Sequence, residues 1–329
     1  MSITVPSSQF CIAIASHIRE ISRVSFLLET LTSLVNQSIK IPIYLSISFD
    51  NDAISTECLR MIKTNKEIEM NNNMLNIKVQ KEITPQMRHY LLLLPELELK
   101  HKWIMFCDDD DKYNINRVET IINTINAMED IVNKDEPIKY NLAGIYENVS
   151  KKPHNIQRHE YWCYCVQIKL LKEFMDSIKL IPEVVNDRCC DVLFAEYLRR
   201  KSSKWVYIGI HEEMYNYRVD NNTDSVTGII QSSQQKYANM TSPPPLGDND
   251  WLDYVLNWND YLYQNIDIFL HDTYLRTIVG FKLDAILQLE FRDNYKIIDY
   301  VDQTHIKRIT DLYNKVRLVC DSIYDNKLE

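Results

Sequence analysis

The stretch WIMFCDDDDKY, residues 103–113, joins a short apolar run directly to four consecutive aspartates, Asp108–Asp111. An apolar run of this length between polar residues is typical of a buried strand. Four adjacent carboxylates repel one another, and partial burial at a strand end raises that cost, so a bound cation would stabilise them. A hard divalent cation, Mg²⁺ or Mn²⁺, prefers oxygen ligands of this kind. We favour this interpretation over an acidic surface turn that caps a helix at residues 113–126.

Strand and helix patterns alternate on both sides of this stretch. Strands are expected at residues 11–16, 41–49, 75–79 and 102–107, and helices at 18–35, 56–66 and 84–94, the last ending near Pro95. The second half predicts strands at 140–148, 161–168 and 205–210, with helices at 170–178 and 191–200. This alternation predicts an α/β fold with a largely parallel sheet flanked by helices.

Length and composition exclude several classes of protein. The 329 residues are enough for about two domains and a large core. The five glycines are too widely spaced for a G-x-G-x-x-G or G-x-x-x-x-G-K pattern, which excludes a glycine-rich nucleotide loop. A net charge of −9 argues against a general nucleic-acid binder. None of the eight cysteines forms a C-x-x-C pattern, so we expect reduced thiols rather than a zinc site.

The N-terminus and the hydropathy pattern predict a soluble, cytoplasmic protein. The segment MSITVPSSQF lacks the basic and long apolar regions of a signal peptide. Apolar runs stay below the roughly 18 residues that a membrane span needs. Three consecutive prolines indicate a linker, so we expect a catalytic domain over residues 1–240, a linker over 241–250 and a helical C-terminal region over 251–329. Aromatic residues in that region predict helix packing, or self-association into a homo-oligomer, rather than stacking on a ligand.

Polar side chains follow the predicted strands. Ser16 and His17 end the first strand, and Asp50 follows the second. The carboxyl ends of parallel strands form the ligand-binding edge of an α/β sheet, so these groups are candidates for nucleotide contacts. The alternatives are a helix cap by Ser16, and an Asx turn or helix cap at residues 50–52. Arg88, on the helix before the aspartates, is a candidate phosphate ligand or a solvated side chain.

Two acidic residues and one histidine in the second half are further candidates. Asp187 and Asp191 flank a cysteine pair ahead of an apolar helix, and each is a candidate general base or helix cap. His211 is a candidate metal ligand, although a lone histidine is more often structural.

These candidate segments follow one another in the order seen in the GT-A fold glycosyltransferases, most closely those of the family two type. The resemblance covers roughly residues 8–228. The resemblance implies a Rossmann-like mixed sheet flanked by helices, with a C-terminal helical appendage outside it. The segments that carry it are CIAIASHIR, LSISFDND, MRHY, WIMFCDDDDKYNINRVETI and CCDVLFAEYLRRKSSKWVYIGIHEEMYNYRVDNNTDSVT.

The resemblance implies roles for individual residues. It assigns to the nucleotide-sugar Ala15, Ser16, His17, Asp50, Arg88, Asp108 and Asp109. Among these, Asp50 matches the uracil-binding aspartate and Asp108 lies near the ribose. Asp110 matches the metal ligand of the D-x-D segment, with His211 as a further candidate ligand.

The catalytic base that the resemblance implies is Asp191, with Asp187 as the runner-up. The implied activity is that of a metal-dependent hexosyltransferase, using Mn²⁺ or Mg²⁺. It would move a sugar from an NDP-sugar, with UDP favoured, to a hydroxyl of a glycan, protein or small molecule, with inversion. Cys190 stands where the family has a glutamate, which keeps open a catalytically impaired binding module. A sugar nucleotidyltransferase is the remaining alternative, although the first strand lacks the glycines of its loop.

Overall fold

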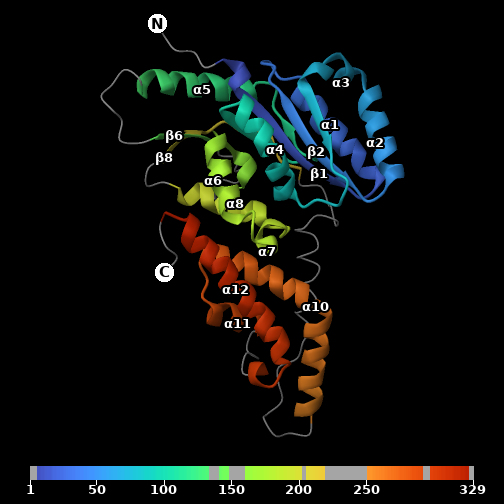
Figure 1. The fold of residues 1–329 in the computed structure, drawn as a ribbon, viewed down its shortest axis with the longest axis vertical. Helices are drawn as coiled ribbons and strands as arrows, with labels where there is room; N and C mark the ends of the chain where they lie inside the picture. The colour runs from blue at the N-terminus through green and yellow to red at the C-terminus, as the bar shows by residue number, and fades with distance from the viewer. Residues whose placement is uncertain are drawn as a thin grey trace. The chain divides into compact units, whose positions relative to one another are not determined.

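The computed structural model describes residues 6–132, 141–147, 160–201, 205–218, 250–291 and 297–325 (Figure 1). The chain divides into two compact units, Met1–Arg218 and Val219–Glu329. The division at Arg218 comes before the linker predicted at 241–250, of which only Asp250 belongs to the described residues. Of the helices described in this chain, none has the length and apolar character needed to cross a membrane.

A mixed seven-stranded sheet forms the centre of the first unit, in the order β3-β2-β1-β4-β7-β6-β8. Its strands are β1 Phe10–Ile18, β2 Ile43–Phe49, β3 Leu75–Val79, β4 Trp103–Cys107, β6 Asn141–Glu147, β7 Tyr164–Gln167 and β8 Trp205–Ile210. Strands β1 to β4 run parallel, whereas β7 runs antiparallel to β4 and β6. The predicted α/β class, with a mixed sheet flanked by helices, is confirmed.

The direction of chain travel across the sheet reverses between β1 and β4. Helix α1 (Val24–Val35) leads from β1 to β2, and α2 (Asp52–Thr64) leads on from β2 toward β3. Helix α4 (Gln86–Lys100) then returns past β1 to β4 and packs against β1 and β2. Right-handed crossovers place α4 on the face opposite to α1 and α2. The carboxyl ends of β1 and β4 therefore form a topological switch point, where open α/β sheets bind ligands.

Large errors in the helix predictions occur at the start of α1 and the end of α4. The helix expected from residue 18 begins at Val24, because β1 continues to Ile18 and residues 21–23 form a 3₁₀ turn. Helix α4 continues through Pro95 to Lys100 instead of ending there. Leu93, Leu94 and Leu97 are buried on both sides of this proline, so packing holds the helix together across the missing N–H.

The remaining elements of the first unit surround the sheet. The helices are α3 Lys66–Met70, α5 Arg117–Val132, α6 Ile168–Ile178, α7 Pro182–Val185 and α8 Cys190–Arg200. A second, two-stranded sheet pairs β5 (Lys112–Tyr113) with β9 (Tyr215–Asn216). The strand predicted to begin at Tyr161 is shorter than expected, because residues 161–163 form a 3₁₀ turn before β7.

Gly144 allows β6 to approach β7 closely. Its φ is 151°, and a Cβ built on it would lie 1.9 Å from the carbonyl oxygen of Cys165. We expect Gly144→Ala to lower the free energy of unfolding by about 3 kcal/mol, because the β6–β7 pairing must distort. Gly209→Ala in β8 is the control, since a Cβ there meets only the His211 ring, at 3.9 Å. Equal denaturant midpoints for the two variants would contradict this account.

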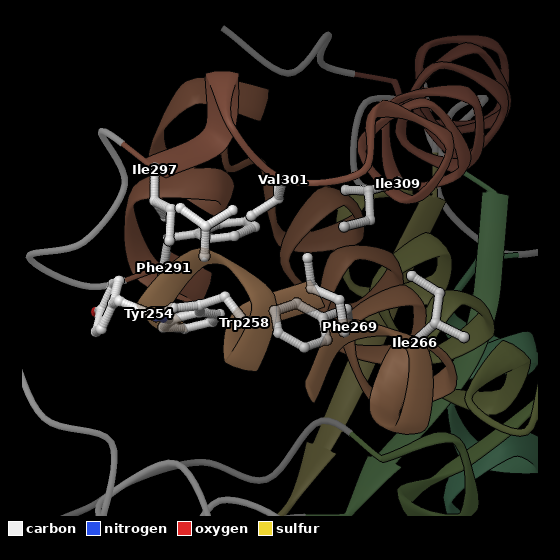
Figure 2. Close-up of a cluster of buried hydrophobic side chains, with 10 residues drawn as sticks. Tyr254, Trp258, Ile266, Phe269, Phe291, Ile297, Val301 and Ile309 are labelled. Atoms are coloured by element: carbon white, nitrogen blue, oxygen red, sulfur yellow. The ribbon is translucent and has the colours of Figure 1, made fainter. Parts of the chain in front are cut away.

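The described part of the second unit is helical, as predicted. It contains α10 (Trp251–Val279), α11 (Leu283–Phe291) and α12 (Gln303–Ile323). Figure 2 shows Trp258 and Phe269 gathered with Phe291 in its core, and the Trp258 and Phe291 rings stack at 5.4 Å between centroids. These aromatic residues therefore serve helix packing inside the unit.

Candidate active site

The aspartate run lies beside the end of β1. The register pairs Ile14 with Cys107, so residues 15–17 lie alongside residues 108–110. The Ser16 hydroxyl donates a 2.6 Å hydrogen bond to Asp109. Ser16 lies within β1 and therefore does not cap a helix, and Ala15 beside it is buried. The structure thus brings together two of the predicted segments at the switch point.

The aspartates do not cap α5, which begins at Arg117. Asp111 is 1% exposed and accepts hydrogen bonds from the Tyr215 hydroxyl (2.8 Å) and the Arg218 backbone N–H (2.7 Å). Through these contacts, Asp111 links β9 and the nearby Arg218 to the aspartate run. The alternative of a capping turn is therefore wrong for these residues.

Asp108 is held by two side chains that the sequence analysis missed. It accepts a 3.0 Å hydrogen bond from Gln86 Nε2 and a second from the Tyr161 hydroxyl. Gln86 opens α4, and Tyr161 precedes β7. Neither type of side chain signals a site by itself, and only the sheet order brings them to Asp108.

Arg23 bridges the two aspartates in the middle of the run. Its Nη2 lies 3.2 Å from Asp110 Oδ2 and 3.8 Å from Asp109 Oδ1. Only its place in the turn after β1 could have indicated this residue from the sequence. Arg218, two residues after β9, donates from Nε to the Asp110 carbonyl at 2.8 Å. Two guanidinium groups therefore lie against the run.

Burial disfavours the ionised forms of three of these aspartates. It raises the pKa of Asp109 to about 6, with a further increase from the charge of Asp110. It likewise raises the pKa of Asp111 to about 7. The pKa of Asp108 is raised well above its usual range by burial and then by Asp111. A bound divalent cation would favour the ionised forms of such a cluster.

Asp50 lies at the end of β2 and contacts the end of β1. The Nε2 atom of His17 is 2.9 Å from Asp50 Oδ1, and Nδ1 is 2.9 Å from the Ser48 hydroxyl. The helix cap in this turn is the neighbouring Asn51, which accepts a 3.0 Å hydrogen bond from the Ile54 N–H. The Asp50 carboxylate, 41% exposed, is thus available to a ligand on the side away from His17.

Asp191 lies in the first turn of α8, a helix that packs against α4. Its negative charge contributes to the raised pKa of Asp108, so the two carboxyl groups are neighbours. Burial raises the pKa of Asp191 to about 7. Its Oδ1 atom is buried and lacks a hydrogen-bond partner among the described residues. A carboxyl group with these properties is suited to taking up a proton near neutral pH.

The other candidate base is already engaged. Asp187 Oδ1 accepts a 2.8 Å hydrogen bond from the Cys189 N–H, as a residue that shapes a helix start does. Arg88 is exposed near this turn and donates to the Asn186 side chain at 3.4 Å. Arg88 therefore lies next to the segment before α8, and its hydrogen bond goes there rather than to the aspartates.

The structure separates His211 from the aspartates. It follows β8, and β8 is three strands away from β4 in the sheet, a distance of ~14 Å at the usual strand spacing. His211 is exposed, and in the described part of the chain it makes no ion pair with the run. The structure therefore does not bring it to the predicted metal ligand, Asp110.

The chain was compared with known proteins. No family model matches it, and no curated protein matches it. It is similar to a structure of S. aureus TarS 1–349 in complex with UDP, at 13% identity and a TM-score of 0.43, over 93% of this chain and 91% of that one. For the complex of the same fragment with UDP-GlcNAc, the identity is 11% and the TM-score 0.44, over 93% and 92% of the two chains.

Two further structures are similar. The chain spans 54% of a longer TarS structure, at 13% identity and a TM-score of 0.42. A 4-diphosphocytidyl-2C-methyl-D-erythritol synthase from Anaerococcus prevotii shows 15% identity and a TM-score of 0.41, over 69% of this chain and 99% of that one. By its own strand order and crossovers, the chain has the mixed α/β sheet and C-terminal helices that the resemblance to GT-A fold glycosyltransferases implies.

Proposed function

We propose that the carboxyl edge of β1, β2 and β4 binds a nucleotide-diphospho-sugar and that the chain transfers the sugar to an acceptor hydroxyl. One observation carries the proposal. Ser16, His17, Asp50 and the aspartate run come from three separate strand ends and meet at the switch point of the sheet. A ligand that spans this edge would meet hydrogen-bond acceptors for a base at the end of β2 and a cation site at the end of β4.

The residues present fit a divalent cation. A single nitrogen of Arg23 already lies within 4.0 Å of carboxylate oxygens from both Asp109 and Asp110, so these two groups face a common point. Their oxygen donors suit Mg²⁺ or Mn²⁺. Asp110 is the proposed principal ligand, with Asp109 beside it, whereas Asp111 is fully engaged by Tyr215 and Arg218. When bound, the cation would neutralise charge on a diphosphate leaving group.

The opposite end of the edge fits a nucleoside. Asp50 offers a carboxylate to the base, and the resemblance favours uracil there. Asp108 is held by Gln86 and Tyr161 in the position proposed for the ribose. Beside the proposed cation site, the guanidinium groups of Arg23 and Arg218 supply positive charge to the diphosphate region.

Asp191 is the proposed general base. Its unpartnered, buried oxygen and its pKa of about 7 suit it to accept the proton of an acceptor hydroxyl as that oxygen attacks the sugar. Direct attack from the side opposite the diphosphate would invert the anomeric carbon. On this reading the enzyme is a hexosyltransferase whose acceptor is a glycan, a protein or a small molecule.

Titration calorimetry with UDP, GDP and TDP, each with and without Mn²⁺, tests the proposed function. We expect UDP to bind most tightly and its affinity to rise at least tenfold with Mn²⁺, because the aspartate run is the cation site. Binding that is equally tight without any divalent cation would contradict the metal site. The absence of binding for all three nucleotides would contradict the enzyme assignment and favour a binding module.

A further inference from the structure

A line of hydrogen bonds runs from Asp50 into the interior of the first unit. From Asp50, His17 makes 2.9 Å contacts through Nε2 to the carboxylate and through Nδ1 to the Ser48 hydroxyl. The same hydroxyl lies 3.2 Å from Nε2 of His89. The Asp50 carboxylate therefore contacts one imidazole directly, and the Ser48 hydroxyl connects that imidazole to a second one.

The line continues past His89, a residue of α4, back to Ser46 on β2 and on to Gln80 after β3. Nδ1 of His89 is 2.8 Å from the Ser46 hydroxyl, and Gln80 Nε2 donates to that hydroxyl at 2.9 Å. Ser46, Ser48 and His89 are each 0% exposed. Burial lowers the pKa of His89 to about 4, so this imidazole is neutral at physiological pH. Ser48 has no access to a substrate, so the Asp–His–Ser order is not a hydrolase triad.

The donors and acceptors leave one arrangement when His17 is neutral. The Asp50 carboxylate only accepts, so His17 carries its proton on Nε2 and its Nδ1 accepts from the Ser48 hydroxyl. Ser48 also accepts from the Thr84 N–H at 3.3 Å, and its second lone pair takes the Nε2 proton of His89. Each group along the line then donates its hydrogen to the next group on the side of Asp50.

The inner end of the line agrees with this direction. With its proton on Nε2, His89 accepts at Nδ1 from the Ser46 hydroxyl. Ser46 in turn accepts from Nε2 of the Gln80 amide, an atom that only donates. Each buried polar group in the line is satisfied, which is the condition under which such a network holds a single arrangement.

We propose that Gln80, Ser46, His89, Ser48 and His17 form a positioning relay that holds Asp50 as an acceptor for the N–H edge of a nucleotide base. The proposal rests on the proposed function for its ligand. His17 occupies Oδ1 of Asp50 and leaves Oδ2 to a ligand. Uracil presents a ring N–H donor on its pairing edge, whereas cytosine presents an acceptor at the same position. The relay therefore selects UDP over CDP, and His17 is a positioning residue rather than a catalytic one.

Binding measurements on variants of His17 test the relay. Titration of UDP with Mn²⁺ is compared with titration of pyrophosphate with Mn²⁺, a probe that lacks the base. We expect His17→Phe to weaken UDP binding at least fivefold and to change pyrophosphate binding less than twofold. His17→Gln, whose amide can still donate to Asp50, should recover most of the UDP affinity. The preference for UDP over CDP should shrink in His17→Phe and return in His17→Gln.

His101→Phe is the matched control. His101 also bonds a hydroxyl, that of Tyr44 at 2.9 Å, and a carbonyl, that of Ser8 at 2.8 Å, but it lies before β4 at the opposite edge of the sheet. We expect this variant to bind UDP as the wild type does. Equal UDP affinity in His17→Phe and the wild type would overturn the relay, as would an equal loss of UDP affinity in His101→Phe.

Imidazole ¹⁵N NMR identifies the tautomers of His17 and His89 in the absence of any ligand. At pH 8.5, about two units above the usual pKa of histidine, His17 and His89 should both show the Nε2–H tautomer, and the His89 signal should shift in His17→Phe. An Nδ1–H tautomer at His17 would overturn the relay even if UDP binds. If both tautomers are as assigned but the wild type binds no nucleotide, the proposed function and the ligand named here are overturned, while the direction of the relay stands.

Discussion

Replacing Asp191 with Asn is expected to lower sugar transfer by roughly 100- to 10,000-fold, the usual contribution of a general base. The amide has nearly the same shape but cannot take up the acceptor proton. UDP affinity should change little, because Asp191 lies on α8 rather than on the strand ends that hold the nucleotide. Release of UDP from a UDP-sugar, with a panel of acceptors or with water, measures the rate.

The pH dependence follows from the same residue. The carboxylate form is the active base, and the pKa of Asp191 is raised by burial to about 7. The rate should therefore be level above that pH and fall about tenfold per unit below it. Asp187→Asn is the control, because its carboxylate already accepts from the Cys189 N–H. If transfer survives Asp191→Asn and collapses in Asp187→Asn, the base is Asp187.

Glu147→Ala is expected to lower the free energy of unfolding by about 3–5 kcal/mol, because it leaves a buried guanidinium without its counter-ion. Arg117 Nε lies 2.6 Å from Glu147 Oε2, and both side chains are 0% exposed. Glu147 also accepts from the Met214 N–H at 2.7 Å, close to the β9 strand that carries Tyr215. Urea unfolding followed by circular dichroism gives the change.

An exposed pair provides the matched control for that substitution. Glu57 pairs with Arg60 at the surface of α2, where their side chains are 42% and 59% exposed. Water screens this pair, so Glu57→Ala should leave the unfolding midpoint nearly unchanged. If Glu147→Ala were as stable as Glu57→Ala, the buried pair would not be holding β6 against α5.

Local sequence patterns predicted most strands of the sheet and which strand ends carry the candidate site residues. The strands at 75–79 and 205–210 are found with the same bounds. The first alternates apolar and polar residues, and the second is an aromatic and β-branched run between polar residues. The meeting of Ser16 with Asp109 follows from parallel strand ends alone. The helix through Pro95 could not be predicted, because the packing that holds it comes from other parts of the chain.

The partners of the aspartates were beyond local pattern for the same reason. Gln86 and Tyr161 reach Asp108 from a helix start and a turn that are 75 residues apart in the sequence. Arg23 is one of many arginines whose neighbours only the folded chain defines. The candidate His211 illustrates the converse, since its residue type suits a metal but its strand lies at the far edge of the sheet.

The affinity of Asp110→Asn for UDP in the presence of Mn²⁺ tests most directly whether the aspartate run is the cation site of a nucleotide-sugar enzyme. The substitution removes the charge of the proposed principal ligand and keeps its shape. Calorimetry should show at least a tenfold loss against the wild type, about 1.4 kcal/mol, and UDP binding to the variant should no longer respond to Mn²⁺. Unchanged affinity, with the same response to Mn²⁺ as the wild type, would contradict the account.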